Sequence, residues 1–389
     1  MKIFYPLLAL GLWLLLQSCD SKQEALTDAS SSTLTLTLTL SDTIYLPLDE
    51  STSLSNRLGS TPFYLPEEDK TYFIHTPTSK NTIQVYDIEK ASLALEIPYQ
   101  VTGPDGIKMP AYYTPIAKDS FFIGNHLTNT YALINKEGKV LKRFRWQDKQ
   151  RIDPFFAGIR HKQQLIFLLS PDYHTLYQFN YTNSAPLKYD SLLLTLDLRT
   201  GERKKYFTWP KKYQKYNFLH TDSNNSICRG PGDTLVLSLA ASHELYLFDL
   251  NHLEAGPIGT VMAKSSMVKL TPMPKGMNPV DASYESSMYG RIIYDPYRKL
   301  YYRIGYTLPI KGKMLKSVIP GLQRPKKDVV VLTLDSHFNV IGEDRIDGAL
   351  IFMGFVTPQG LVFKENYVNQ ETAPQDAFRF FVFTPKKKE

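Results

Sequence analysis

A four-strand pattern recurs six times between residue 62 and the end of this chain, the last time one strand short, and it constrains the fold more than any other feature. In each unit a tight turn joins two short apolar strands, a loop of variable length follows, and a second tight turn joins the third strand to the fourth. The first unit shows this as Pro62–Leu65, Thr71–His75, Thr82–Asp87 and Ala94–Ile97. Repeats of this size indicate a propeller or a solenoid.

The missing strand has a candidate at the other end of the repeats. The sixth unit ends with the strand Ala377–Phe383, whereas Thr43–Leu48 precedes the first unit and belongs to no other. A propeller closes when an N-terminal strand completes the last blade, because this removes an exposed sheet edge. We therefore predict an all-β, six-bladed β-propeller closed by its N-terminal strand. The alternatives are a seven-bladed propeller, with one blade hidden in residues 262–327, and a double-sheet sandwich. The Thr-Leu alternation at residues 33–40 is either an extra edge strand or part of a tether.

Composition agrees with a folded, strand-rich chain. Aromatic residues make up 13% of the sequence, with 25 Tyr and 21 Phe, and aromatic rings suit pleated, half-buried surfaces. The formal net charge is +7, but the basic residues fall in short clusters such as Arg203–Lys205 and Lys386–Lys388. Nucleic-acid binding requires basic residues on one stripe with interleaved stacking rings, so we predict no nucleic-acid partner.

The N-terminus has the order of features found in bacterial lipoprotein signals. Met1-Lys2 is followed by the apolar stretch Ile3–Leu16, which is shorter than the roughly 20 residues that span a bilayer. The sequence Leu16-Gln-Ser-Cys19 then resembles a lipobox, in which the cysteine thiol accepts a diacylglyceryl group. A free thiol at Cys19, or a disulfide with Cys228, is the alternative. If Cys19 is acylated, Cys228 is left as a small buried apolar residue.

The predicted domain organisation follows from this signal. Residues 1–18 form a lipoprotein signal peptide, residues 19–32 contain the lipidated Cys19 and a flexible tether, and residues 33–389 form a single propeller domain. We expect an outer-membrane lipoprotein that is held to the membrane by its lipid anchor and faces either the periplasm or the cell surface.

The long connections between the predicted strands all lie at the same end of those strands. In a propeller, the connection from strand two to strand three and that from strand four to the next blade emerge on the same face. All long loops belong to these two kinds: Pro98–Pro110, Trp146–Pro154, Ser170–Ser191, Pro210–Asn225, Met262–Tyr289, Tyr306–Lys327 and Tyr367–Asp376. Loops longer than about 12–15 residues are usually functional or disordered, so we predict that this long-loop face is the functional surface.

Candidate binding residues lie in or beside these loops. Three histidines fall in loops of three successive units, as metal ligands gathered from different blades would, although ordinary surface histidines are the simpler interpretation. Tyrosines offer flat faces for sugars or peptides, and charged residues beside the longest loop could add polar specificity. The candidates are Asp105, His126, Tyr173, His174, His220, Tyr284, Glu285 and Arg291.

The turn Gly103-Pro-Asp-Gly106, taken together with the lipobox and the six-unit layout, resembles a family of Bacteroidota lipoproteins of unassigned activity. The resemblance spans most of the chain and implies a six-bladed propeller of the TolB-like or NHL-like kind. A role for Asp105 in binding is one interpretation of the motif. A plain tight turn, with Pro at its second position and Gly at its end, is the interpretation that the residues favour.

Motifs of the common catalytic centres are absent. The sequence has no G-x-S-x-G elbow, no phosphate-binding glycine loop and no C-x-x-C pair, and His243-Glu244 lacks the second histidine of a zinc-protease helix. We therefore predict a non-enzymatic binding or scaffolding module without a cofactor, which presents its long-loop face to a protein partner or a glycan. The alternative is a propeller enzyme, such as a hydrolase, a lactonase-like esterase or a polysaccharide lyase, with a metal or a His/Tyr/Arg site at the channel mouth.

Overall fold

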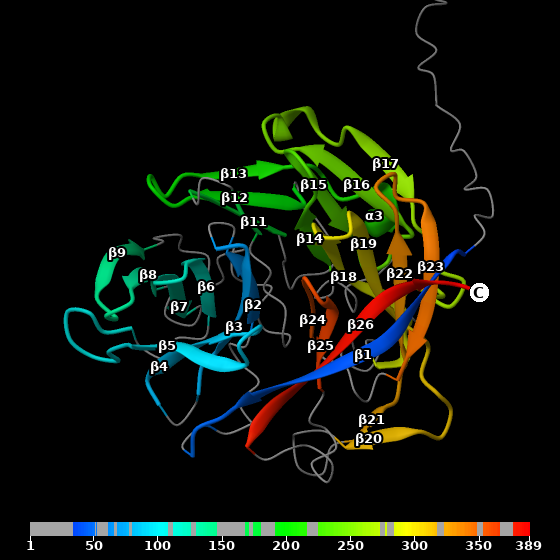
Figure 1. The fold of residues 1–389 in the computed structure, drawn as a ribbon. Coiled ribbons are helices and arrows are strands. Elements are labelled where there is room, and N and C mark those ends of the chain that lie inside the picture. The colour runs from blue at the N-terminus through cyan, green and yellow to red at the C-terminus, as the bar shows by residue number, and fades with distance from the viewer. Residues whose placement is uncertain are drawn as a thin grey trace, which may run out of the picture. The chain divides into compact units, whose positions relative to one another are not determined.

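The computed structural model describes residues 34–50, 52, 61–65, 68–77, 80–107, 112–125, 130–145, 168–170, 174–179, 191–215, 225–272, 277, 284–316, 323–347, 353–365 and 376–389. Strands dominate these residues (Figure 1), as the sequence predicted. The helical residues among them are few and include α3 (Lys211–Lys215) and a 3₁₀ turn at Leu253–Ala255. No helix in this part of the chain is long and apolar enough to cross a membrane.

Four sheets are antiparallel, four-stranded and arranged in chain order. The first contains β2 (Thr61–Leu65), β3 (Lys70–His75), β4 (Thr82–Asp87) and β5 (Ser92–Pro98). The second contains β6 (Tyr112–Ala117), β7 (Ser120–Asn125), β8 (Thr130–Asn135) and β9 (Val140–Arg145). The third contains β10 (Leu168–Leu169), β11 (Thr175–Phe179), β12 (Leu193–Asp197) and β13 (Arg203–Tyr206). The fourth contains β14 (Ser226–Arg229), β15 (Thr234–Ser238), β16 (Glu244–Asp249) and β17 (Gly259–Met262).

The remaining large sheet has eight strands and consists of two four-stranded antiparallel halves. One half contains β18 (Met288–Asp295), β19 (Leu300–Tyr306), β22 (Val329–Leu334) and β23 (Val340–Ile346). The other contains β24 (Met353–Thr357), β25 (Gly360–Lys364), β26 (Ala377–Lys387) and β1 (Leu36–Pro47). A single parallel pairing, Leu36 with Gly342, joins the halves through β1 and β23.

The N-terminal strand completes the last half-sheet, as predicted. β1 pairs antiparallel with β26 from Leu36 opposite Lys387 to Pro47 opposite Ala377. The Thr-Leu alternation is the first part of this strand, so it is neither a separate edge strand nor a tether. Leu46, which lies opposite Phe378, is fully buried, and this explains why β1 pairs in this register.

Hydrophobic clusters join most neighbouring sheets. The cluster between the first two sheets includes Ile74 and Ile123, and other clusters join the later sheets in chain order. The second and third sheets meet where Lys142 Nζ donates a hydrogen bond to Leu198 O at 3.0 Å. Phe380 of β26 packs against Phe73 of β3, so the last half-sheet contacts the first sheet. The sheets therefore follow one another in a closed, propeller-like order.

The third sheet differs from the prediction. Its first described strand is β10, which forms the edge of the sheet. The second strand, β11, lies inside the predicted loop Ser170–Ser191. Ser170 Oγ accepts hydrogen bonds from the amides of His174 and Thr175, and this tight turn brings β11 back along β10. Leu176 and Tyr177 are buried as a result.

Cys228 is a small buried apolar residue, as the sequence predicted. It is a free cysteine in β14, it is buried, and burial raises the pKa of its thiol. It packs with Val236 and Tyr301 as an apolar residue.

Candidate functional site

The connection between β19 and β22 is a hairpin that extends beyond the sheet, in the lower part of Figure 1. Backbone hydrogen bonds join Thr307 N to Asp328 O at 3.0 Å and Ile310 N to Lys326 O at 2.8 Å. Farther out, β20 (Met314–Lys316) pairs with β21 (Gln323–Pro325). We call the described residues of this connection, 307–316 and 323–328, the projecting hairpin. The sequence predicted this segment as a loop. The structure shows that it contains the strand pair β20–β21.

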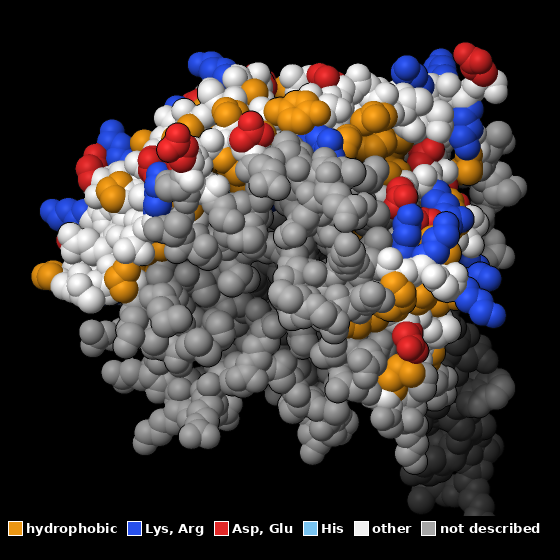
Figure 2. Space-filling view, turned by 90° about the horizontal axis from the view of Figure 1, so that it is seen from below, with side chains coloured by type: hydrophobic (Ala, Val, Ile, Leu, Met, Phe, Trp, Pro, Cys, Tyr) orange, Lys and Arg blue, Asp and Glu red, His pale blue; other side chains and the backbone are white. Residues whose placement is uncertain are grey.

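The described surface of the projecting hairpin is apolar and basic. Leu308 is 42% exposed and Met314 is 52% exposed, and Lys311 and Lys313 are exposed beside them. Seen from below (Figure 2), basic and hydrophobic side chains lie next to one another along the right side of the described surface. Apolar side chains that remain exposed on an ordered projection are typical of interaction surfaces.

Tyr284 and Glu285, two of the predicted residues, lie at the base of this hairpin. They precede β18, and Tyr284 is half-buried whereas Glu285 is exposed. Lys327 Nζ donates a hydrogen bond to the carbonyl of Ser286. Burial lowers the pKa of Lys327 to about 7, and the nearby Glu285 carboxylate opposes that shift. The structure thus groups Tyr284 and Glu285 with a lysine that the sequence did not single out.

Arg303, in β19, is a buried cation that organises the neighbouring connections. Its Nη1 donates to His243 O and Ala263 O, each at 2.8 Å, and its Nη2 donates to Ser242 O at 2.6 Å. Its Nε donates to Ser238 Oγ at 3.0 Å. The guanidinium lies 3.6 Å from the centre of the Tyr289 ring. Burial lowers the pKa of Arg303 to about 10, so the side chain is still charged at neutral pH.

His243 and Tyr289 form a hydrogen-bonded pair beside Arg303. Tyr289 Oη accepts a hydrogen bond from Ser265 N at 2.9 Å and lies 2.7 Å from His243 Nδ1. Burial, followed by the charge of Arg303, lowers the pKa of His243 to about 4, so its ring is neutral at pH 7. The hydrogen bond between the phenol and Nδ1 therefore joins two neutral groups. Burial also raises the pKa of Tyr289, so this pair is suited to hydrogen bonding and does not contain an ionised nucleophile.

Other predicted residues lie away from the projecting hairpin. Asp105 Oδ1 accepts a hydrogen bond from Val140 N at 3.0 Å, and Gly106 N donates to Gly103 O at 3.0 Å. The tight-turn interpretation of Gly103–Gly106 is thus confirmed, and the Asp105 carboxylate connects this turn to β9.

His174 and Arg291 also take positions that differ from the predicted ones. His174 lies in the turn between β10 and β11, where its carbonyl accepts from Leu198 N at 2.7 Å, beside the β12–β13 turn. This is the end of the sheet opposite to the long connections. Arg291 is buried within β18, and its Nη1 donates to Gly354 O of β24 at 2.8 Å. It therefore joins two neighbouring strands and does not flank an exposed loop.

Four predicted residues, Cys19, His126, Tyr173 and His220, lie outside the described residues. Among the residues that are described, no group of three His, Cys, Asp or Glu side chains is placed to hold a metal ion. Sequence reasoning missed Arg303 and His243. A signal for Arg303 was present, because it is a charged residue in the middle of the apolar strand Leu300–Tyr306.

Comparisons with known proteins identify the fold and a family but no activity. The profile of the family described as "Domain of unknown function (DUF4221)" matches residues 35–345. A crystal structure of a DUF4221 member from Bacteroides vulgatus is 21% identical, with a TM-score of 0.70, and the match covers 92% of this chain and 100% of that one. A candidate exported protein from Bacteroides fragilis is 10% identical, with a TM-score of 0.53, and the match covers 93% of this chain and 98% of that one. No curated protein matches this sequence.

Proposed function

This chain belongs to the DUF4221 family, and we propose that it is a membrane-anchored binding module that holds a protein partner through the projecting hairpin. The hairpin itself is the observation that carries the proposal. It is ordered by its own backbone hydrogen bonds, and it keeps Leu308 and Met314 exposed beside Lys311 and Lys313. A partner with an apolar patch and acidic residues around it fits this surface.

The backbone that Arg303 holds in place supports a rigid binding surface. Arg303 holds four carbonyls in place, so the backbone of the neighbouring connections is preorganised. The four carbonyls are those of Leu239, Ser242, His243 and Ala263. A preorganised surface loses less conformational entropy on binding. The aromatic rings near Arg303, those of Tyr289, Tyr246 and Tyr213, are buried, so they do not form a sugar-stacking platform. This favours a protein over a glycan as the partner.

We take the four separate sheets and the two halves of the eight-stranded sheet as six blades of a propeller. The clusters between neighbouring sheets, the Lys142 hydrogen bond between the second and third sheets and the pairing of β1 with β26 support this count. In this arrangement the projecting hairpin connects the second and third strands of the fifth blade. It therefore emerges on the face that carries the long loops.

The anchor belongs to the same proposal. Replacing Cys19 by Ser is expected to abolish incorporation of labelled palmitate and to release the chain from the membrane fraction, because acylation requires the thiol. The candidate exported protein of Bacteroides fragilis supports an exported location. Metabolic labelling and membrane fractionation in a Bacteroidota host check the expectation. Labelling that persists in Cys19→Ser excludes this anchor.

The binding surface is tested by photo-crosslinking in native membranes. A photoreactive amino acid at Met314 is expected to give one reproducible protein adduct, and the paired substitutions Leu308→Ser and Lys311→Glu should reduce it at least tenfold. Loss of one buried apolar contact and one charge pair is worth about 1–3 kcal/mol, which corresponds to such a factor.

Ile258 provides a matched control for this experiment. It is 63% exposed and precedes β17, on a turn of the fourth sheet. A photoreactive group at Ile258 should give no adduct with the same protein. Equal adducts at both positions, or none at Met314, would contradict the proposed surface.

A further inference from the structure

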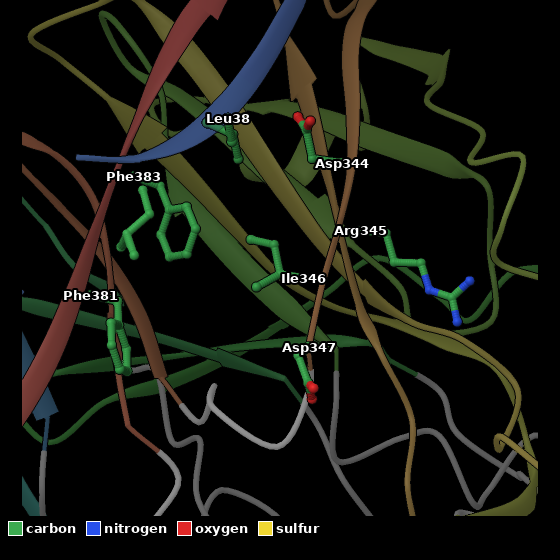
Figure 3. A pocket seen from close by; sticks show the side chains of 8 residues that line it. Leu38, Asp344, Arg345, Ile346, Asp347, Phe381 and Phe383 are labelled. Carbon is green, nitrogen blue, oxygen red and sulfur yellow. The ribbon is translucent and has the colours of Figure 1, made fainter. Parts of the chain in front are cut away.

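A groove of about 310 Å³ opens between β23 on one side and β1 with β26 on the other (Figure 3). It lies beside the base of the projecting hairpin, where Asp347 pairs with Lys326. Its lining residues are Leu38, Leu40, Asp344, Arg345, Ile346, Asp347, Phe381 and Phe383. Of these, Leu40 is 56% exposed, which makes it a large apolar side chain open to solvent at the groove.

The groove exists because two strands meet at one point and then separate. Thr35 N donates to Ile341 O at 2.8 Å, and Leu36 pairs with Gly342. Beyond this point β1 follows β26 and β23 follows β22, and no described backbone hydrogen bond joins β1 to β23. Both strands therefore present an edge with peptide groups that point away from their sheets. Such edges can accept an added strand.

The floor of the groove is apolar. Figure 3 shows the side chains of Leu38, Ile346 and Phe383 directed toward the same space. All three also border the hydrophobic cluster around Tyr302 and Phe363, so they are supported from below by buried residues. An apolar side chain placed here would extend that cluster and would be removed from contact with water.

A carboxylate supplies the polar feature of the groove. Asp344 Oδ1 accepts a hydrogen bond from Thr37 Oγ1 at 2.6 Å, whereas Asp344 Oδ2 is buried and has no donor among the described residues. Arg345 does not supply one, because its side chain points away in Figure 3 and pairs with Asp328. A buried acceptor without a donor is costly and is satisfied by a ligand that carries an N–H group.

We propose that this groove binds an extended segment of a partner protein, added along the edge of β23, with an apolar side chain on the floor and a Lys or Arg at Asp344. The positive charge of that residue complements the unpaired carboxylate oxygen. A second copy of this chain fits less well, since its β1, LTLTLSDTIYLP, contains no basic residue. The inference is independent of the projecting hairpin, because it depends on different residues.

A peptide-binding assay with the purified full chain tests this inference. The probe is a fluorescent seven-residue peptide of alternating valine and lysine, measured by anisotropy. Asp344→Asn keeps the shape of the side chain and is expected to weaken binding at least tenfold. Leu40→Lys places a charge at the exposed margin of the groove, without disturbing the buried core, and is expected to weaken binding to a similar extent.

The control variant is Asp42→Asn, which removes the same charge from an exposed position of β1 that does not line the groove. It should change the Kd less than twofold. A valine–glutamate peptide and a peptide N-methylated on alternate residues should both bind at least tenfold more weakly than the valine–lysine peptide.

Several outcomes would overturn the proposal. These are no saturable binding of the valine–lysine peptide below about 1 mM, equal binding of the N-methylated peptide, or unchanged affinity in Asp344→Asn and Leu40→Lys. A dimer in sedimentation that is lost in Leu40→Lys would identify a second copy as the occupant instead. Because none of these variants alters Leu308 or Met314, crosslinking at the projecting hairpin gives a separate result.

Discussion

Replacing Arg303 by Met is expected to lower the free energy of unfolding by about 3–5 kcal/mol. Arg303 is fully buried, and its guanidinium donates hydrogen bonds to the carbonyls of His243, Ala263 and Ser242. Methionine fills a similar volume but leaves these acceptors buried without donors. Each unsatisfied carbonyl costs about 1–3 kcal/mol, and partial rearrangement of the connection keeps the total below the simple sum.

Urea unfolding measures this effect, and amide hydrogen exchange locates it. Exchange of the amides in residues 239–243 should accelerate more than exchange in β7 or β8, because only the former segment depends on Arg303. The free energy of unfolding of Arg303→Lys should lie between those of the unsubstituted protein and Arg303→Met, since lysine keeps the charge but lacks the planar set of donors. The exposed Arg199 provides the control, and Arg199→Met should change the free energy of unfolding by less than about 0.5 kcal/mol.

A second measurement separates the electrostatic role of Arg303 from simple packing. The charge of Arg303 helps to hold the pKa of His243 at about 4. In Arg303→Met the pKa of His243 should rise toward its ordinary value, although burial will still keep it below 6.5. Titration of the His243 ring followed by NMR checks this. If Arg303→Met is as stable as the unsubstituted protein and the pKa of His243 is unchanged, the cation organises neither the connection nor the histidine.

Deleting residues 34–47 is expected to abolish soluble, monomeric protein. These residues form β1, which covers the full length of β26, from Ala377 to Lys387. Without β1, β26 becomes a long exposed edge rich in phenylalanine, and such an edge promotes aggregation. A synthetic peptide of residues 34–48, added during refolding, should restore monomeric protein by pairing with β26 in trans. Size-exclusion chromatography with light scattering measures the recovery.

Point substitutions distinguish closure by β1 from a general effect of the deletion. Leu46, in β1, is fully buried in the cluster that contains Phe378. Leu46→Ala should therefore lower the free energy of unfolding by about 2–5 kcal/mol. Leu40 lies on the same strand but is 56% exposed, and Leu40→Ala should have an effect below about 0.5 kcal/mol. Equal effects of the two substitutions, or a soluble monomer after the deletion, would contradict a closing role for β1.

The order of strands was predictable because it depends on local patterns. Alternating apolar residues and tight turns are properties of neighbouring residues, and they located nearly every strand of the first, second and fourth sheets. The pairing of β1 with β26 was also predictable, because a closed fold requires each edge to find a partner. The third sheet was harder to predict. The Ser170 turn, which directs β11 back along β10, depends on side-chain hydrogen bonds that no alternation pattern reports.

The candidate sites were predictable only in part. The long connections pointed to the correct end of the sheet for Tyr284 and Glu285, and to the segment that forms the projecting hairpin. They did not show that this segment pairs with itself, because β20 and β21 are short and are separated by residues without a strand pattern. Arg291 was misplaced for a related reason, since a charged residue beside a loop looks exposed until its buried partner, Gly354 O, is known.

The sequence by itself determined the all-β class, the repeated four-strand units and the strand that closes them, because these follow from periodicity and from the need to pair every edge. Only the tertiary structure decided which distant groups meet. Arg303 reaches from the eight-stranded sheet to the carbonyls of His243 and Ala263 in the fourth sheet and its connections. β1 pairs with β23 at a single residue before the two strands separate at the groove. Contacts of this kind depend on the twist and packing of whole sheets, and no local pattern of residues records them.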